Sequence, residues 1–386
     1  MRKTVFCLFL LLVSTISCIS TSAVEPIEQE ATKETEPTPS PIPDWPPVSG
    51  PDPSHRVGAF YHTWYLNPEF DGRWYHWDQN NYYQPPLDIG SDYYPVLGAY
   101  SSTNPDVMAQ HFAWMREAGI GLIIADWWGW DSPSDKVLPL VFDIADHYGL
   151  EVAFVMEQYD YRSAGSLVSD IRQLKKLYGD HPAFFWTTEI SLYSPDDNKK
   201  GLFFMWNTTQ PEDGKPTVPF DYWKGTLDKL HSDDTGAIVL TDEYFSDYMP
   251  QSHFDGSYNY GVLDTDDIGY TYAHDLPSGA WYVPGINPGF SAWRIGYDPI
   301  VDTPRKNGQT YIDRWESMFA IGIEPQMVVI TTFNEWHEGT QIEPARSGAT
   351  TSDGEDYLDY GDLGSEGYLK LTREWVDRFL SHEWPE

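Results

Sequence analysis

The chain has 386 residues, of which 16% are aromatic, and its formal net charge is -35. Such an excess of negative charge repels nucleic acid and anionic membranes, which argues against both as partners and favours a neutral ligand. The length allows one large domain or two ordinary ones, with a substantial core in either case.

The first 18 residues are typical of a secretory signal. Arg2 and Lys3 precede an apolar run over residues 5–13, and small residues follow that run. The run is too short to span a membrane. We therefore expect this segment to be a signal peptide and not a membrane anchor helix.

Cys18 and the residues before it resemble a bacterial lipobox, in which the cysteine is lipidated after cleavage, although Thr15 stands where Leu is usual. A cell-surface lipoprotein of a bacterial cell envelope and a simply secreted protein are therefore the two alternatives. Cys7 also lies in the leader, so the mature domain has no structural disulfide. Residues 19–54 are rich in Glu, Thr, Ser and Pro and predict a disordered tether, which leaves residues 55–386 as the folded domain.

From residue 56 onward, strand-like and helix-like segments alternate. One helix is predicted to begin at Asn104-Pro105, an N-cap followed by proline in the first turn, and to stop at Gly119. The strand candidates are residues 57–65, 120–125, 151–156, 183–186, 202–206, 237–240, 256–260, 281–283 and 327–332, and further helices are predicted before Gly149 and over residues 166–177, 221–230, 311–321 and 368–379.

About eight strand–helix units favour a single α/β domain with the (β/α)8 TIM barrel fold over a doubly wound sheet. Of the runs 183–186 and 202–206, one is expected to be an excursion from the main pattern. No glycine-rich phosphate fingerprint follows a strand, as a Rossmann-type fold would require. In a barrel, functional groups gather at the C-terminal ends of the strands, where this interpretation places Asp126, Glu157 and Glu335.

Residues 326–343 combine a buried strand with a crowded group of polar side chains. Glu335, His337, Glu338 and Glu343 follow the strand among aromatic residues. Desolvating such groups is costly, and folded proteins accept that cost at sites that use them. Glycoside hydrolysis needs one carboxyl group that protonates the leaving oxygen and a second that assists attack at the anomeric carbon. Glu335 and Glu338 are therefore the predicted catalytic pair.

A metal site and a solvated surface pair are the alternatives for the same glutamates. His337, Glu338 and Glu343 offer ligand atoms, but the His-Glu-x-x-His spacing that puts two imidazoles on one helical face is absent. We predict no metal and no cofactor. The aromatic flanks and the preceding buried strand disfavour a surface pair, and His62 and His76 are interpreted as core or rim histidines.

Aromatic side chains near the strand ends could supply flat faces for sugar rings, with hydroxyl or indole groups as hydrogen-bond partners. Packing in the core is the alternative for each of them. Asp126 and Glu157 are either substrate ligands or orienting carboxylates, and Arg294 is either a binding residue or a structural counter-charge. The aromatic candidates are Tyr61, Trp64, Trp77, Trp127, Trp128, Tyr258 and Tyr260.

Residues 332–343, with the sequence TFNEWHEGTQIE, resemble the signature of glycoside hydrolase family 99, the endo-α-1,2-mannosidases and endo-α-1,2-mannanases. Other segments resemble the family in the same order, so the likeness covers residues 56–382. These segments are Phe60-Tyr61 with Trp64-Tyr65, Asn67-Pro68, Phe70-Asp71-Gly72, His76-Trp77, Phe254-Asp255-Gly256 with Tyr258 and Tyr260, Pro288-Gly289-Phe290, and Tyr357-Leu358-Asp359-Tyr360.

The resemblance implies a (β/α)8 fold and retaining hydrolysis inside an α-mannan or N-glycan chain, without a metal. One glutamate is expected to remove the proton from the sugar's own 2-hydroxyl, which closes onto the anomeric carbon as a 1,2-anhydro sugar. By position, Glu335 matches that base. Glu338 matches the acid that protonates the departing oxygen and then deprotonates the attacking water.

The same resemblance implies substrate contacts. Glu157 matches a carboxylate of the family's pocket, Tyr260 a tyrosine near the reacting sugar, and Trp128 an aromatic residue one subsite further from the cut. Asp126 stands where a small polar residue is expected, which leaves the sugar in that subsite open. Residues 187–219 do not align, so the contacts on the leaving-group side are unassigned.

The sequence therefore predicts a monomeric, endo-acting α-mannosidase whose substrate is an α-mannan or mannose-containing glycan. Tyr61, His337 and Arg294 complete the expected set of substrate-binding residues. Two alternatives remain, a surface glycan-binding lipoprotein without catalysis and a related hydrolase of another α-linked polysaccharide. The intact glutamates disfavour the first, and Asp126 motivates the second.

Overall fold

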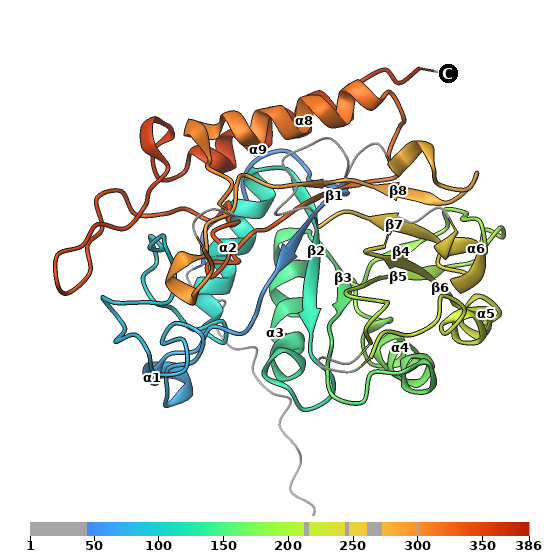
Figure 1. The fold of residues 1–386 in the computed structure, drawn as a ribbon. Coiled ribbons are helices and arrows are strands. Elements are labelled where there is room, and N and C mark those ends of the chain that lie inside the picture. The colour runs from blue at the N-terminus through green and yellow to red at the C-terminus, as the bar shows by residue number, and fades with distance from the viewer. Residues whose placement is uncertain (1–44, 212–215, 244–246, 261–271, 299–301, 386) are drawn as a thin grey trace, which may run out of the picture. The chain divides into compact units, whose positions relative to one another are not determined.

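The structure, a computed structural model, describes residues 45–211, 216–243, 247–260, 272–298 and 302–385. Parallel strands in these residues form a nearly closed sheet in the order β8-β7-β6-β5-β3-β2-β1-β10-β9 (Figure 1). The predicted signal peptide and most of the predicted tether lie outside the described residues. The strands are β1 (Ser54–Tyr61), β2 (Ile120–Trp127), β3 (Glu151–Met156), β5 (Lys200–Met205), β6 (Gly236–Thr241), β7 (Gly256–Tyr258), β8 (Trp281–Val283), β9 (Gly285–Ile286) and β10 (Val328–Ile330).

A broken strand closes the ring. β8 and β9 follow one another in the chain and are separated only by Pro284, which has no N–H to donate to a ladder. β8 pairs with β7, and β9 pairs with β10, so the two halves join the ends of the sheet. Counted as one strand, they give eight parallel strands in the described residues, and the predicted (β/α)8 barrel is confirmed.

The predicted excursion is the run at 183–186. β4 (Trp186–Thr187) pairs antiparallel with β5 and lies outside the ring order, whereas β5 is a barrel strand. The strand predicted over residues 57–65 begins earlier and ends at Tyr61. The four residues that follow Tyr61 therefore belong to the rim of the barrel.

Helices flank the sheet on its outer side (Figure 1). α2 begins as predicted, because the side chain of Asn104 accepts a hydrogen bond from the N–H of Asp106 and proline occupies the first turn. α3 ends at Gly149, whose φ of 64° suits glycine. The helices are α1 (Pro68–Asp71), α2 (Pro105–Glu117), α3 (Pro133–Tyr148), α4 (Ala164–Tyr178), α5 (Lys224–His231), α6 (Tyr248–Ser252), α8 (Gln309–Ile321) and α9 (Gly367–Leu380).

The strands bury both of their faces in two separate clusters. Phe60, Ile124 and Phe204 belong to the cluster inside the ring. Ala59 and Tyr61, the neighbours of Phe60, belong to the larger cluster that the strands share with the helices. Side chains alternate between the two faces of a strand, so the register of β1 decides which of its residues can reach the interior.

Residues 45–53, at the end of the predicted tether, lie against α2 and α3. The indole N–H of Trp45 donates to the Asp106 carboxylate (3.1 Å), and the Tyr148 hydroxyl donates to the Pro46 carbonyl (2.8 Å). The folded unit therefore begins before β1. The hypothesis of a tether concerns the residues before these, which lie outside the described part of the chain.

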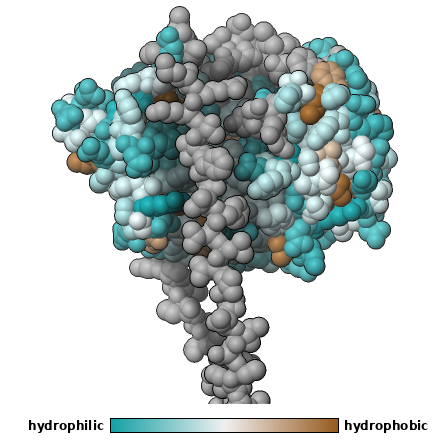
Figure 2. Space-filling view, turned by 60° about the horizontal axis from the view of Figure 1, so that its bottom comes forward, coloured by the Kyte–Doolittle hydropathy of each residue, from teal (hydrophilic) through white to brown (hydrophobic). Residues whose placement is uncertain are grey.

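The face drawn in Figure 2 is mostly hydrophilic, with hydrophobic residues in small spots. This agrees with a charge of -35 on the chain. In the described part of the chain, every helix is too short or too polar to cross a membrane.

Candidate active site

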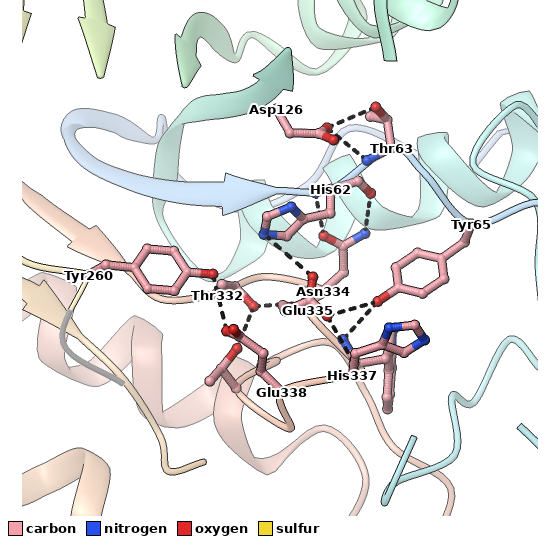
Figure 3. Close-up of polar contacts among 12 residues, drawn as sticks. His62, Thr63, Tyr65, Asp126, Tyr260, Thr332, Asn334, Glu335, His337 and Glu338 are labelled. Atoms are coloured by element: carbon pink, nitrogen blue, oxygen red, sulfur yellow. Dashed lines mark hydrogen bonds and ion pairs between the residues drawn. The ribbon is translucent and has the colours of Figure 1, made fainter. Parts of the chain in front are cut away.

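Residues that follow different strands meet at one end of the barrel (Figure 3). Glu335 and Glu338 follow β10, Asp126 lies at the end of β2, Glu157 follows β3, and Tyr260 follows β7. Burial raises the pKa of Tyr260 well above its usual value, and the charges of Glu338, Glu335 and Glu157 raise it further. These carboxylates therefore surround one tyrosine, at the end of the barrel that the sequence predicted.

The loop after β10 presents both glutamates from one turn. The N–H of Glu335 donates to Thr332 Oγ1 (2.7 Å), and the carbonyl of Glu338 accepts from the N–H of Ser291 (2.9 Å). Gly339 has a φ of 61°, and a Cβ there would lie 2.5 Å from the Ser291 carbonyl oxygen. Glycine is thus required for the chain to turn back immediately after Glu338.

Asn334 fastens this loop to the end of β1. Its Oδ1 accepts from the N–H of His62 (2.7 Å), and its Nδ2 donates to the His62 carbonyl (2.8 Å) (Figure 3). From the same segment, the Tyr65 hydroxyl donates to Glu335 Oε1 (3.3 Å) and accepts from the N–H of Trp336 (3.0 Å). The side chain of Glu335 is therefore held against β1 as well as by its own loop.

Glu335 and Glu338 influence each other electrostatically. Glu335 is 3% exposed, and burial followed by the charge of Glu338 raises its pKa well above the usual value. Burial also raises the pKa of Glu338, to about 7. Two neighbouring carboxylates do not easily ionise together, so the pair binds protons more strongly than two isolated glutamates.

Hydrogen bonds indicate which glutamate carries the charge. Glu335 accepts from the Tyr65 hydroxyl (3.3 Å) and from the N–H of His337 (2.9 Å), whereas Glu338 accepts only a long bond from the Tyr260 hydroxyl (3.4 Å) among the described residues. Although burial acts more strongly on Glu335, two donors favour its ionised form. The arrangement therefore suits a base at Glu335 and an acid at Glu338.

Asp126 and Glu157 form the second half of the carboxylate group. Burial raises the pKa of Glu157 to about 8, and the charge of Asp126 adds to the shift. Asp126 Oδ1 accepts from the N–H (2.9 Å) and the hydroxyl (2.8 Å) of Thr63, and burial raises its pKa to about 7. Its Oδ2 has no hydrogen-bond partner in the described residues and is enclosed, because Asp126 is 0% exposed.

Two histidines of the site are neutral. His62 stacks on Trp64 with ring centroids 4.3 Å apart, and its Nε2 lies 3.9 Å from Glu335 Oε2. Burial lowers its pKa to about 3. His337, predicted as a substrate contact, donates from Nε2 to the His76 carbonyl (2.9 Å), and burial lowers its pKa to about 4. The imidazole of His337 therefore holds the loop that contains His76, while the backbone N–H of His337 donates to Glu335.

Two predicted substrate contacts lie elsewhere. The Tyr61 hydroxyl contacts His111 Nδ1 (3.0 Å) in the outer core, because Tyr61 points away from the interior of the ring on β1. The guanidinium of Arg294 donates to the Ile89 carbonyl (2.9 Å) and to the Asp88 carboxylate. The structural alternative therefore holds for Arg294, and neither side chain is brought to the carboxylate group.

Glu343, weighed above as a metal ligand, is a fully buried core residue. It accepts from the Tyr100 hydroxyl (2.8 Å) and the Trp336 indole N–H (2.8 Å), and its other oxygen contacts His111 Nε2 (3.1 Å). No group of three or more His, Cys, Asp or Glu side chains in the described residues is arranged to hold a metal.

Aromatic rings continue the site on the side of β2. Trp64 stacks on His76 with ring centroids 4.8 Å apart, and its ring lies 6.0 Å from that of Trp128, which is 39% exposed. Trp128 therefore offers a partly exposed ring beside Trp64. The packing alternative holds for the candidates that are fully buried, which are Trp77, Trp127 and Tyr258.

The profile of Glycosyl hydrolase family 99 matches residues 54–381. The chain belongs to glycosyl hydrolase family 99. It is 32% identical over 370 residues to a glycoprotein endo-alpha-1,2-mannosidase of Mus musculus, an alignment that covers 84% of this chain and 75% of the mouse protein. The corresponding protein of Xenopus laevis is 29% identical over 371 residues, with 86% and 79% covered.

A solved structure gives the same result. The GH99 endo-alpha-mannosidase from Bacteroides thetaiotaomicron, in complex with BIS-TRIS-propane, superimposes with a TM-score of 0.72 and 27% identity over 85% of this chain and 98% of that chain. The predicted family 99 membership and glycoside hydrolase activity are thereby confirmed. This family 99 enzyme thus carries its carboxylates at the strand ends of a TIM barrel.

Several residues that support the site of this family 99 enzyme have no role predicted from sequence. Tyr65 and Asn334 belong to the family motifs without an assigned function, and His62 is predicted only as a core or rim histidine. Their signal was position, since His62 and Tyr65 follow a strand end directly and Asn334 precedes Glu335. Which group each one meets depends on contacts about 270 residues apart in the chain.

Proposed function

We propose that this glycoside hydrolase cleaves internal α-1,2-mannosidic linkages of a mannan or N-glycan, with retention of configuration and through a 1,2-anhydro sugar. The observation that carries the proposal is the pair Glu335, which is buried, and Glu338, which is half-buried: both come from one turn after β10, near Glu157 and Tyr260, and the pKa of each is raised. The printed activity of the relatives, endo-alpha-1,2-mannosidase, supports the linkage.

In the first step, the Glu335 carboxylate takes the proton of the sugar's 2-hydroxyl. The O2 atom bonds to the anomeric carbon, the glycosidic C1–O bond breaks, and Glu338 gives its proton to the departing oxygen. The products of this step are the released chain and a 1,2-anhydro sugar. The donors from Tyr65 and His337 favour the ionised form of Glu335 that this role needs, and burial raises the pKa of Glu338 to about 7, which favours the protonated form that the acid needs.

In the second step, the Glu338 carboxylate takes a proton from a water whose oxygen bonds to C1. The C1–O2 bond breaks, and O2 recovers its proton from Glu335. Two inversions at C1 give net retention. Both glutamates return to their starting states, and neither becomes covalently attached to the sugar.

The stereochemistry of mannose favours this route. In an α-mannoside, the 2-hydroxyl and the glycosidic oxygen lie on opposite faces of the ring, so O2 can attack C1 from behind the departing bond. An α-glucoside has its 2-hydroxyl on the same face as the glycosidic oxygen and lacks this alignment. A sugar with trans 1,2-oxygens is therefore the substrate class that a base at Glu335 can use.

The test uses two substrates. An internal α-1,2-mannoside should yield oligosaccharide products whose new reducing end has the α configuration when first formed, as read by NMR. A matched substrate with fluorine in place of the 2-hydroxyl should not be turned over, and intact-mass analysis should find no glycosyl adduct. A β-configured first product would overturn retention, and an adduct on Glu335 would indicate a glutamate nucleophile instead of the 2-hydroxyl.

The location of the enzyme is a separate proposal. The signal-like residues 1–18 and the lipobox-like Cys18 support a cell-surface lipoprotein of a bacterial envelope. Metabolic labelling with a palmitate analogue tests it, with Cys18→Ser as the control. Labelled wild-type protein and unlabelled variant are expected, and an unlabelled wild-type protein would leave simple secretion.

Asp126 favours a second candidate substrate. Its buried Oδ2 has no partner in the described residues, and it lies among the groups beside Glu157. A sugar hydroxyl that reached Asp126 Oδ2 would donate a hydrogen bond to this carboxylate. A related α-linked polysaccharide whose neighbouring sugar offers such a hydroxyl is therefore the alternative, and a glycan panel with product masses distinguishes it from mannan.

A further inference from the structure

A cavity of about 630 Å³ lies beyond Trp128, between the loop that follows β2 and the loop that follows β3. Trp128 and Trp130 come from the first loop, and Gln158 and Tyr161 come from the second. The cavity adjoins the site at two of its lining residues, because the Trp128 ring lies 6.0 Å from that of Trp64 and Gln158 directly follows Glu157 in the chain.

The cavity is bordered by exposed aromatic side chains. Trp128 and Trp130 are each 39% exposed, and Tyr161 is 81% exposed. Exposed aromatic side chains gathered around one hollow are typical of a binding site, and flat rings with polar edges are suited to sugars. Trp130 is also held in place, since its indole N–H donates to Asp170 Oδ1 (2.8 Å). A fixed ring loses little conformational entropy when a ligand stacks on it.

Tyr161 is held outward in a strained backbone conformation. Its φ is 71°, a region that bulky residues seldom adopt. The next residue, Arg162, is fully buried and donates to the carbonyls of Met156 (2.7 Å), Pro211 (2.8 Å) and Asn207 (3.0 Å). These hydrogen bonds of Arg162 hold the loop on its buried side. The backbone of Tyr161 therefore keeps its positive φ while the tyrosine ring lies in solvent. Strain of this kind tends to be retained where it serves a site.

We propose that this cavity is a distal sugar subsite, which binds a neutral hexose of the substrate glycan beyond the sugar that contacts Trp128. The inference rests on the proposed function and extends it to substrates longer than the two sugars nearest the cut on that side. Asp131 and Asp160 line the same cavity and offer oxygens to sugar hydroxyls. Their charge, with that of the whole chain, favours a neutral sugar over an anionic one.

The test compares two lengths of one substrate. The short oligosaccharide ends at the sugar expected on Trp128, and the long one carries one or two further α-linked hexoses on that side. Wild-type enzyme should show the higher kcat/KM on the long substrate. Tyr161→Ala should lower kcat/KM about tenfold on the long substrate, mainly through KM, and leave the short substrate within about twofold.

Two control variants separate stacking from a general effect. Tyr161→Phe keeps the ring and should retain the preference for length. Leu177→Ala removes an exposed apolar side chain of α4 that does not line the cavity, and should change neither substrate. If Tyr161→Ala affects both lengths equally, or retains the wild-type preference, the subsite is overturned while the proposed function stands. If wild-type enzyme cleaves neither substrate, the proposed function fails, and the inference fails with it.

Discussion

Glu335 and Glu343 lie on the same loop, and both are buried, yet their surroundings differ. Glu343 has hydrogen-bond partners on both of its oxygens, from Tyr100, Trp336 and His111. Glu335 lies among other carboxylates, and burial with the charge of Glu338 raises its pKa well above the usual value. The first is a satisfied core group, and the second is held in an unfavourable state.

The comparison shows that burial alone does not distinguish a carboxylate that stabilises the fold from one that belongs to an active site. A buried carboxylate with a complete set of donors stabilises the fold, because removing it leaves those donors unpaired. A buried carboxylate next to another carboxylate costs free energy and gains a proton affinity that is useful near neutral pH. In this chain, both kinds lie within one motif of twelve residues, and only the structure shows that Glu343 is a core group with partners on both of its oxygens.

The largest expected effect comes from the catalytic pair. Glu338→Gln should lower kcat at least a thousandfold, because it removes the proton donor and the later proton acceptor. Binding of a glycan should remain measurable by calorimetry, and the midpoint of thermal unfolding should not fall. Glu335→Gln should behave in the same way. Turnover of the Glu338 variant near the wild-type rate would refute its assignment.

Glu343→Gln should have the opposite profile. The variant loses the charge that accepts from Tyr100 and Trp336 in a fully buried setting, so unfolding in urea should show a loss of about 3 kcal/mol. The folded protein should keep kcat within about threefold of wild type. A loss of activity with unchanged stability would mean that Glu343 belongs to the site and not to the core.

Glu157 allows the energetic cost of the site to be measured as a function of pH. Because its pKa is about 8 in the folded protein, the native state holds a proton that the unfolded chain releases near pH 4.3. Wild-type stability should therefore fall as pH rises through that window. Glu157→Gln removes this loss, so its stability relative to wild type should improve by about 5 kcal/mol between pH 4 and pH 9, at about 1.4 kcal/mol for each unit of the pKa difference. An equal difference at both pH values in urea unfolding would contradict the shift.

The smallest effect is expected from a pair of tyrosines. Tyr65→Phe removes a donor that favours the ionised form of Glu335, so the pKa of Glu335 should rise. The acidic limb of the kcat/KM profile should move to higher pH, with about a tenfold loss at neutral pH. Tyr61→Phe removes a hydroxyl from the outer core beside His111 and should leave the pH profile unchanged. If the acidic limb shifts equally in both variants, the hydrogen bond from Tyr65 is not what sets the pKa of Glu335.

The sequence by itself determined the local elements and the leading chemistry. The N-cap at Asn104, the stop at Gly149 and the β-branched run of β2 specify their elements through short-range preferences, and the structure has them where they were predicted. Glu335 and Glu338 could be singled out because polar groups crowded after a buried strand are rarely accidental.

Only the tertiary structure decided which side chains meet. Pro284 closes the ring by splitting one strand between β7 and β10, which local propensity does not reveal. Tyr61 and Tyr65 both fall in the strand predicted over residues 57–65. The two-residue period of β1 directs Tyr61 into the outer core, where it contacts His111. Tyr65 lies beyond the end of the strand, and its hydroxyl donates to Glu335. Such choices depend on register and on partners hundreds of residues away, because a side chain's chemistry is set by what surrounds it after folding.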